Sequence, residues 1–313
     1  MRLLLYLRKL IWVRKLIAYS RRIHFFGNKN ISLYELFSLY YNGLQKASLN
    51  TKAAAISWNL FLGLFPFMLF FLVLLQVMPH YEFIQQYIVE QLIARLMPEN
   101  LIEPSREYFN ARLLQVSSES KNIFAVLSFS MLIYLYYASN GINALINGLY
   151  SFNLVQDKKR NVFKQYFVAL MLTVFLAVLM LSVLTILYYT EVIWKLMAEY
   201  SLLQDYNLSV IRILKFFFFV LIFFLGVSVL YYKGPKNSLR YKEVIPGATL
   251  TTILFLITMY ALGFLVSNFE RYNVLYGSVG TIMILMITIY TDVILILIGY
   301  ELNIAIKRAN MEN

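Results

Sequence analysis

The sequence predicts an all-α protein that crosses a membrane several times, and three observations support this fold class. Only 14% of the 313 residues are charged, whereas a soluble domain carries about 25%, and the mean hydropathy is +0.66. The charged residues leave long uncharged stretches between them, and the segments that separate these stretches alternate in the sign of their charge. A water-facing surface needs more charge, so a soluble enzyme, a disordered chain and a solvent-exposed repeat array are excluded.

Six apolar stretches are long enough to cross the hydrocarbon core, which takes about 20 residues in a helix. The predicted transmembrane helices lie at about 54–78, 122–148, 165–189, 211–232, 244–267 and 278–305. Backbone groups find no water partners in lipid, which favours helices, and the short alternating strands typical of a β-barrel do not occur in these stretches. We therefore expect a polytopic membrane protein with six transmembrane helices.

The charge of the connecting segments predicts the orientation. Basic residues dominate segment 1–50, the loops after the second and fourth predicted spans, and the tail at 307–313, whereas acidic residues dominate 79–121 and the loop after the third span. Basic loops stay in the cytoplasm, so both chain ends are expected there. The predicted organisation is a basic cytoplasmic or interfacial segment at 1–50, a six-helix transmembrane domain at 51–306 and a cytoplasmic tail at 307–313.

The first 26 residues carry a basic side and an apolar side. On a helical wheel Arg8, Lys15 and Arg22 fall opposite Trp12 and Tyr19, which predicts an amphipathic helix lying in the headgroup layer. We interpret it as an anchor that holds anionic headgroups and keeps the N-terminus inside. Specific lipid or nucleic-acid binding stays open as the alternative. The basic residues interrupt every candidate apolar core, which argues against a signal peptide.

The segment 79–121 is predicted to form a helical loop on the extracytoplasmic (periplasmic) side. Its apolar spacing predicts one amphipathic helix at about 81–96 and a second at about 105–114, with Pro98 ending the first and Pro104 opening the second. We interpret the glutamates of this loop as a solvated face, and a substrate gate is the alternative.

Two carboxylates within the sixth predicted span are candidate functional residues, because a charge at the bilayer centre costs about 2.5–3.5 kcal/mol on insertion scales. Asp292 lies midway along the span, and Glu301 follows nine residues later near its cytoplasmic end. The two side chains are about 180° apart on the wheel, so they do not form a pair. Asp292 is either a hydrogen-bonded structural residue or a proton, cation or translocation site. Glu301 either reaches water or pairs with a Lys or Arg.

A row of asparagines and a proline-containing segment supply further candidates. Asn140, Asn143 and Asn147 share one face of the second span, where they either form interhelical hydrogen bonds or line a polar cavity. Pro66 lacks an N–H group and can kink the first span. The candidate polar cavity or translocation path comprises Trp58, Asn59, Pro66, Asn140, Asn143, Asn147, Asp292 and Glu301.

The sequence predicts no catalytic, cofactor or metal site. The chain has no cysteine, which excludes disulfides and thiolate chemistry. It has two histidines, and His24 lies in the basic N-terminal segment whereas His80 follows the first predicted span, on the opposite membrane face. Hydrolysis of RNA would need metal-binding carboxylates or an acid–base set in one wet site, and no such cluster stands on the cytoplasmic side. We therefore do not expect an enzyme.

Four stretches carry a resemblance to a known family. They are 52–66 (KAAAISWNLFLGLFP), 140–150 (NGINALINGLY), 234–235 (GP) with 244–248 (VIPGA), and 276–280 (YGSVG) with 298–303 (IGYELN). The sequence resembles the YihY/BrkB family of bacterial inner-membrane proteins, formerly labelled ribonuclease BN. The last pair is similar to the family's Tyr-Gly-Ser-Leu-Gly and Gly-Ala-Glu-Leu-Asn. Tyr300 replaces the usual Ala, and Asp292 stands where the family more often has a small or uncharged residue.

The resemblance implies a six-helix protein of the bacterial inner membrane, in a family connected to envelope integrity, serum resistance and lipid or solute transport. It also implies that the ribonuclease label is a misassignment. We expect a transporter or translocator of a lipid or amphipathic envelope component. A non-transporting scaffold for envelope integrity is the alternative, and a membrane-bound hydrolase ranks below both. Membrane lipids are the expected partners, nucleic acid is not, and a homo-oligomer stays open.

Overall fold

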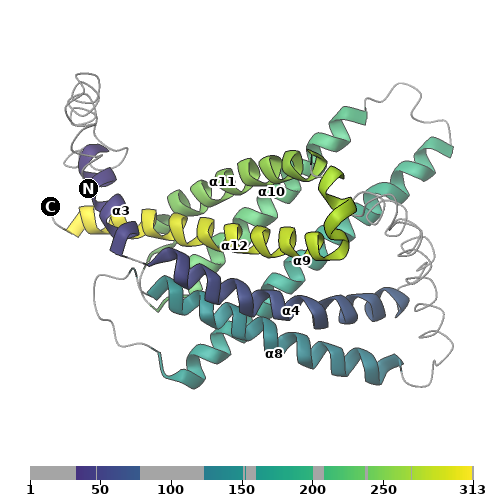
Figure 1. Cartoon of the computed structure of the whole chain (residues 1–313), viewed down its shortest axis with the longest axis horizontal. Coiled ribbons are helices and arrows are strands. Elements are labelled where there is room, and N and C mark those ends of the chain that lie inside the picture. Colours follow the sequence, from purple (N-terminus) through teal and green to yellow (C-terminus); the bar gives the residue numbers. More distant parts are fainter. Residues whose placement is uncertain are drawn as a thin grey trace.

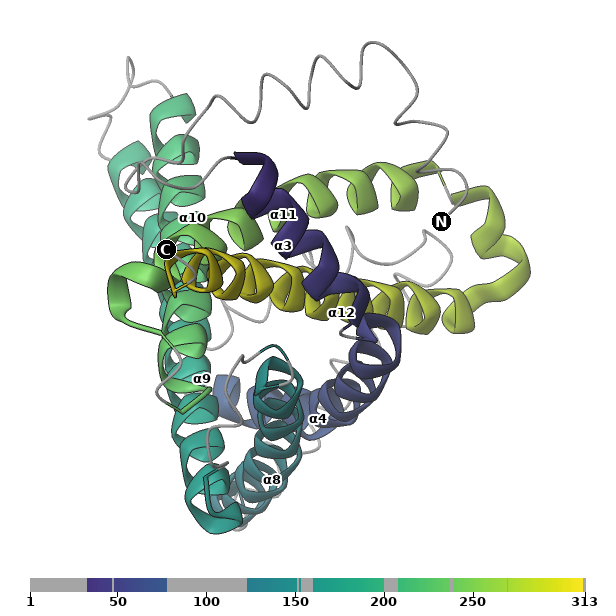
Figure 2. The ribbon, with the colours of Figure 1, turned by 90° about the vertical axis from the view of Figure 1, so that its left-hand side faces the viewer.

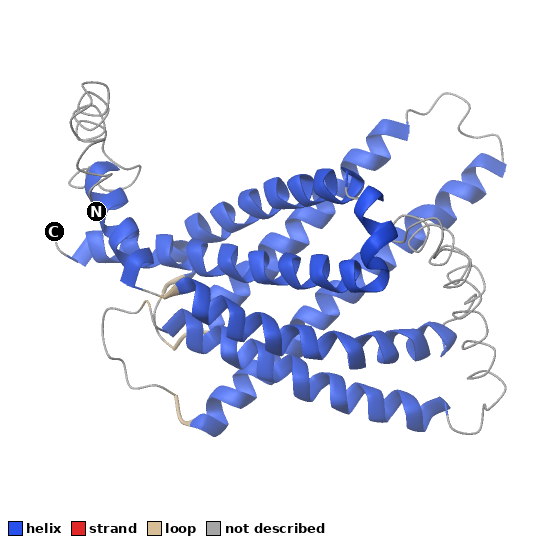
Figure 3. Cartoon of the chain, viewed as in Figure 1, coloured by secondary structure: helices blue, strands red, loops and turns tan. Residues whose placement is uncertain are grey.

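A computed structural model describes most of the chain and shows an all-helical fold there (Figure 3). It describes residues 33–46, 48–77, 123–150, 152, 160–199, 208–236, 239–268 and 270–311, and these ranges contain no strand. The amphipathic helix predicted within the first 26 residues and the loop predicted at 79–121 lie outside the described residues.

Six long helices coincide with the six predicted spans, and a shorter helix precedes them. They are α3 (Leu33–Lys46), α4 (Leu49–Val77), α8 (Ile123–Tyr150), α9 (Val162–Glu199), α10 (Leu208–Lys233), α11 (Tyr241–Asn268) and α12 (Glu270–Met311). α12 therefore includes residues 307–311 of the predicted cytoplasmic tail.

Four of these helices are long and apolar enough to cross a membrane, judged over the residues the structure describes. The candidate spans are Val162–Val183, Ile213–Lys233, Tyr241–Phe264 and Ile282–Met311. α4 and α8 lie at the first and second predicted spans, and their crossing stays a prediction. The structure thus supports a helical membrane protein with several spans.

The six long helices form three antiparallel pairs, α4 with α8, α9 with α10, and α11 with α12 (Figure 1). Each pair packs on the next, because α8 contacts α9, α10 contacts α11, and α12 contacts α4. The helices therefore close into a ring, seen from one end in Figure 2. We call this end the packed end; α4, α9 and α11 begin there, and α8, α10 and α12 end there.

Burial of side chains is concentrated at the packed end. The buried apolar residues of α4 begin at Ala53, those of α8 lie near its end at Ile142–Tyr150, and those of α12 lie between Val293 and Ala309. Most of the described side chains further along the helices are half-buried or exposed, with Ser130 an exception. Figure 1 shows that the three pairs diverge away from the packed end. Side-chain packing therefore closes the ring at one end.

Three buried aromatic side chains fill the centre of the packed end. Tyr300 of α12 lies between Tyr231 of α10 and Phe152, which follows α8, with ring centroids 5.4 Å and 6.3 Å away. Aromatic side chains bury the most area per residue and dominate the energetics of a core. Because these three rings come from three different pairs of helices, their contacts join the pairs.

Basic side chains gather at the packed end, around the ends of the helices. The described ones at this end include Lys52, Arg160, Lys164, Lys233, Lys236, Arg240, Lys242 and Arg308. This arrangement agrees with the predicted alternation of basic and acidic loops. The location of this end in the cytoplasm stays a prediction.

α3 was not predicted as a separate helix, because it was counted as part of the basic segment 1–50. It crosses the end of α12 (Figures 1 and 2), where Leu36 packs against Ala305 and Ala309. Ser48, with a positive φ of 45°, makes the sharp turn from α3 into α4. The small side chains of Ala305 and Ala309 allow α3 to lie close to α12.

α11 and α12 approach each other closely at two glycines. A Cβ atom added at Gly247 would overlap the carbonyl oxygen of Gly299, and one added at Gly299 would lie 2.7 Å from the carbonyl oxygen of Gly247. Small residues at such contacts let two backbones approach in a membrane, where the hydrophobic effect does not drive helices together.

We predict that Gly299→Ala lowers the free energy of unfolding by about 1–3 kcal/mol, because the added methyl group overpacks the contact with α11. Thermal or denaturant unfolding in detergent micelles measures this effect. Gly263→Ala is the matched control, since nothing lies within 4 Å of a Cβ atom there. It should leave stability unchanged or raise it slightly. Equal stability of the two variants would contradict the close approach.

Candidate functional site

The candidate site lies at the packed end around a buried ion pair between Glu301 and Arg308. Arg308 Nη1 donates to Glu301 Oε1 at 2.8 Å, and the two side chains are 16% and 0% exposed, respectively. They are seven residues apart on α12, which places them on the same face two turns apart. A buried pair gains attraction but loses hydration, and removing one partner strands the other charge.

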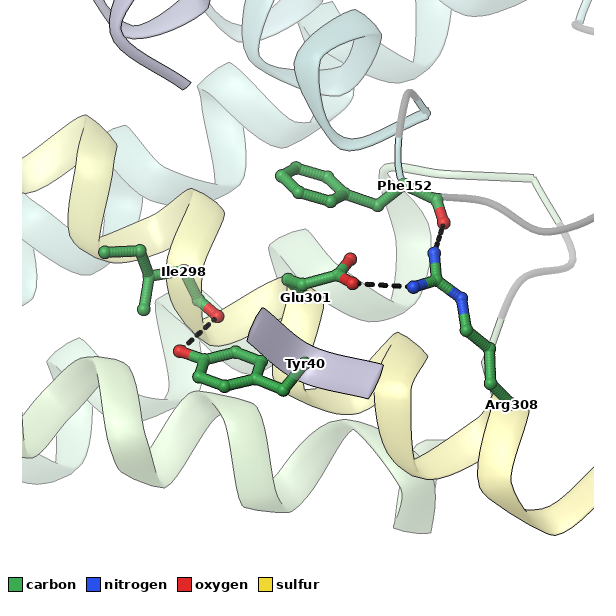
Figure 4. Close-up of polar contacts among 5 residues, drawn as sticks. All are labelled: Tyr40, Phe152, Ile298, Glu301 and Arg308. Carbon is green, nitrogen blue, oxygen red and sulfur yellow. Dashed lines mark hydrogen bonds and ion pairs between the residues drawn. The ribbon is translucent and has the colours of Figure 1, made fainter. Parts of the chain in front are cut away.

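Arg308 also connects α12 to the segment that follows α8. Its Nη2 atom donates to the carbonyl oxygen of Phe152 at 2.7 Å (Figure 4). The Phe152 ring lies beneath the Lys52 ammonium, 5.7 Å from the ring centroid, which is a cation–π distance. Partial burial lowers the pKa of Lys52. One arginine thus holds a carboxylate of α12 and the backbone after α8 at the same time.

α3 covers the ion pair from a third direction. Tyr40 donates its hydroxyl to the carbonyl oxygen of Ile298 at 3.3 Å (Figure 4). Burial, and secondly the negative charge of Glu301, raise the pKa of Tyr40 to about 12, so its phenol stays protonated and remains a donor. A Cβ atom at Gly43 would overlap Glu301 Oε1, which shows how closely α3 lies on the pair. We call Tyr40, Gly43, Phe152, Glu301 and Arg308 the Glu301 cluster.

Two polar atoms of the Glu301 cluster have no partner among the described residues, namely Glu301 Oε2 and Arg308 Nε. In Figure 4 a dashed line joins only one carboxylate oxygen of Glu301 to Arg308. Buried polar atoms are almost always paired, so an unpaired carboxylate oxygen needs a reason. Glu301 Oε1 therefore holds the arginine, whereas Oε2 has no partner in the part of the chain described.

A second polar network joins α11 and α12 next to the cluster. Asn303 is fully buried; its Oδ1 accepts from the Gly247 N–H at 2.6 Å, and its Nδ2 donates to the Val244 carbonyl at 3.1 Å. Pro246 lacks an N–H group, so the first turns of α11 lack one backbone hydrogen bond. A side chain from a neighbouring helix can therefore bond backbone groups there. The stretches 244–248 and 298–303 therefore contact each other directly.

Tyr231 of α10 extends this network. Its hydroxyl donates to the carbonyl oxygen of Ile296 at 2.6 Å and shares a 2.7 Å hydrogen bond with Thr251 of α11. Thr251 also lies 2.9 Å from the carbonyl oxygen of Gly247. Three helices thus exchange hydrogen bonds inside the packed end, where Tyr231, Thr251 and Asn303 are fully buried.

The asparagine row of α8 is hydrogen-bonded to α9. Gln165, which is 7% exposed, donates to Asn143 Oδ1 at 2.7 Å and to Asn147 Oδ1 at 2.9 Å. Asn140 accepts from the hydroxyl of Tyr166, the next residue of α9. These contacts are hydrogen bonds between helices, which is one of the two interpretations given for this row.

The remaining predicted site residues do not join the Glu301 cluster through any contact described here. Trp58 is 53% exposed and stacks on Phe61 of its own helix, and Asn59 donates to the Ala55 carbonyl one turn earlier. Pro66 lies within α4.

Asp292 lies on α12 about 14 Å along the helix axis from Glu301, and its Oδ1 atom has no partner among the described residues. The structure therefore brings together Asn140, Asn143 and Asn147, and keeps the two carboxylates apart, as their spacing predicts.

Several residues of the site were missed by sequence reasoning. Arg308 follows Glu301 by seven residues, a spacing that indicates a pair. The sequence, however, equally allowed the Glu301 side chain to reach water. Tyr40, Gly43 and Gln165 carry no local signal, because their roles depend on which helices meet.

Among the residues described, no three His, Asp or Glu side chains lie close enough together to hold a metal ion. That the chain is not an enzyme stays a prediction.

The helices, their apolar surfaces and the internally paired polar groups define a polytopic helical membrane protein. The chain belongs to the BrkB family, because the family model described as virulence factor BrkB matches residues 40–313. This confirms the resemblance drawn from the four stretches. No solved structure matches the chain.

The relatives are proteins from several bacteria. A Bacillus subtilis protein with a ribonuclease-like name, YfkH, is 30% identical over 275 residues, covering 87% of this chain and 93% of the relative. A UPF0761 membrane protein of Pseudoalteromonas translucida is 38% identical over 88 residues, covering 28% of this chain and 29% of the relative. One from Xanthomonas campestris is 32% identical over 79 residues, covering 25% of this chain and 19% of the relative.

We predict that Arg308→Met lowers the free energy of unfolding by about 3–5 kcal/mol, because it leaves Glu301 buried without its partner. Adding Glu301→Gln should recover a large part of this loss, since no buried charge then remains. A double-mutant cycle from unfolding in detergent measures the coupling. Arg240→Met, an exposed arginine at the same end, is the control. Additive effects of the two substitutions would contradict the ion pair.

We predict that Gln165→Leu lowers the free energy of unfolding by about 1–2 kcal/mol, because two asparagine oxygens lose their shared donor in the α8–α9 contact. Asn59→Ala is the control, since Asn59 bonds only its own helix in the contacts described. Unfolding of both variants is followed in the same detergent. A smaller loss for Gln165→Leu than for Asn59→Ala would refute the role of the asparagine row.

Proposed function

We propose that this protein is a transporter or translocator of a lipid or amphipathic envelope component in the bacterial inner membrane. The observation that carries the proposal is the asymmetry of the ring: its helices are packed together at one end and diverge towards the other (Figure 1). Transporters that work by alternating access are closed on one side of the membrane at a time. In this proposal the packed end faces the cytoplasm and is closed.

The Glu301 cluster suits the role of a gate at the closed end. It joins three separate elements, α3, the residue after α8 and the end of α12, so it can open without unfolding any one helix. The contacts that cross between these elements are the hydrogen bonds of Arg308 to Phe152 and of Tyr40 to Ile298, and the ion pair with Glu301 on the same helix orients Arg308 for its contact. We propose that breaking these two contacts between elements opens this end.

The surfaces away from the packed end suit an amphipathic substrate. Exposed aromatic side chains line α10, where Phe216 and Phe217 are 57% and 59% exposed. Such surfaces contact acyl chains, either of the bilayer or of a bound lipid. Asp292, whose Oδ1 is unpartnered among the described residues, is the candidate for a polar contact to the headgroup.

We expect the full-length protein, reconstituted in liposomes, to move at least one class of labelled lipid across the bilayer, measured by chemical quenching of the outer leaflet. Glu301→Gln weakens the proposed gate, and each 1.4 kcal/mol lost from the closed state raises the open population by about tenfold. The rate should rise accordingly. Arg240→Gln, outside the cluster, should keep the wild-type rate.

The alternatives give distinct outcomes. Absence of movement for every lipid class tested, together with a stable partner recovered by crosslinking in cells, would favour the scaffold. Hydrolysis of RNA by the purified protein, lost in Glu301→Gln, would favour a hydrolase. A rate that does not change in Glu301→Gln would overturn the gate while leaving transport intact.

A further inference from the structure

A cavity of about 600 Å³ lies beside the start of α9 at the packed end. Its lining includes three cationic residues, Arg160, Lys164 and Lys236, and an apolar side formed by Phe163, Phe167 and Val168. We propose that this cavity binds an anionic phospholipid, with the phosphate among the cations and the acyl chains along α9. This inference does not depend on the proposed transport function.

Among the residues that the structure describes, none neutralises the positive charge of the cavity. None of the lining residues is acidic. Arg160 donates to the carbonyl oxygens of Lys233 at 3.2 Å and Gly234 at 2.8 Å, which are neutral acceptors. Neither Lys164 nor Lys236 has an ion pair within the part of the chain that the structure describes. Three unneutralised cations around one cavity attract a phosphate.

Two of the cationic residues of the cavity are held in place by hydrogen bonds. Both terminal nitrogens of Arg160 bond the backbone at the end of α10. The backbone N–H of Lys236, close by in the chain, donates to the Tyr150 hydroxyl at 2.8 Å. Because groups of the protein hold these residues, less ordering is left for binding to accomplish.

The apolar side of the cavity favours a lipid over a free phosphate. Phe163 and Phe167 are 85% and 62% exposed. They lie in the first turns of α9, at the start of the candidate span Val162–Val183. The cationic site therefore continues directly into a surface that is suited to acyl chains. A soluble phosphate would contact the cations alone, whereas a phospholipid uses both sides.

The test measures lipid retained by the purified full-length protein in a neutral detergent, titrated with phosphatidylglycerol and counted by native mass spectrometry. Lys164→Gln with Lys236→Gln should weaken binding by about thirty-fold, since each cation near an anionic headgroup contributes about five-fold. Lys164→Arg with Lys236→Arg should retain it. The matched control, Arg240→Gln with Lys242→Gln, removes two exposed cations at the same end outside the cavity and should change binding by less than about two-fold.

The remaining arms decide the chemistry of the ligand. Inorganic phosphate should not displace phosphatidylglycerol, and phosphatidylcholine should bind weakly in the wild type and in both glutamine variants. Displacement by inorganic phosphate would overturn the proposal that the ligand is a lipid and would identify it as a soluble anion. Unchanged retention in the cavity variant, or equal losses in the cavity and control variants, would overturn the site.

Discussion

The buried polar atoms at the packed end are shielded from water, and this constraint accounts for the hydrogen bonds between helices there. Glu301, Asn303 and Tyr231 are fully buried, and each finds partners on another helix or on a distant turn of its own. In lipid the hydrophobic effect does not hold helices together, so close packing and internal hydrogen bonds must do so. Both are concentrated at one end of this ring, which explains why the other ends of the helices are free to diverge.

The stretches that resemble the family become contacts between helices. Gly141 and Gly148 in stretch 140–150 lie against Leu60 and Ile56 of stretch 52–66, which pairs α8 with α4. Stretch 244–248 meets stretch 298–303 through Gly247, Gly299 and Asn303. The side chains of residues 276–279 lie outside the part of the protein that the structure describes. These motifs therefore serve first to assemble the packed end, and Lys52 and Glu301 are the charged residues that they bring to it.

The six helices could be predicted because the positions of Lys, Arg, Asp and Glu alone reveal the uncharged stretches. The pairing of Glu301 and Arg308 was also within reach, since it depends on spacing along one helix. The docking of α3 was not, because it requires Gly43 to meet a carboxylate more than 250 residues later in the chain. The same holds for Gln165, whose two asparagine partners belong to another helix. Sequence periodicity identifies the apolar and polar faces of each helix, but it does not show which faces of different helices contact each other.

The proposed lipid cavity and the Glu301 cluster are connected through the short segment that contains Tyr150 and Phe152. Tyr150, which accepts from Lys236 at the cavity, is two residues from Phe152, whose carbonyl accepts from Arg308. Phe152 N–H in turn donates to the Leu149 carbonyl at 3.2 Å, so this segment continues the end of α8 as a turn. A lipid at the cavity therefore contacts Lys236, whose backbone is bonded to a residue two positions before the one that holds the arginine of the gate. Such a link couples the two sites only if the lipid binds the closed and open arrangements with different affinity, and the shared segment is where that difference would arise.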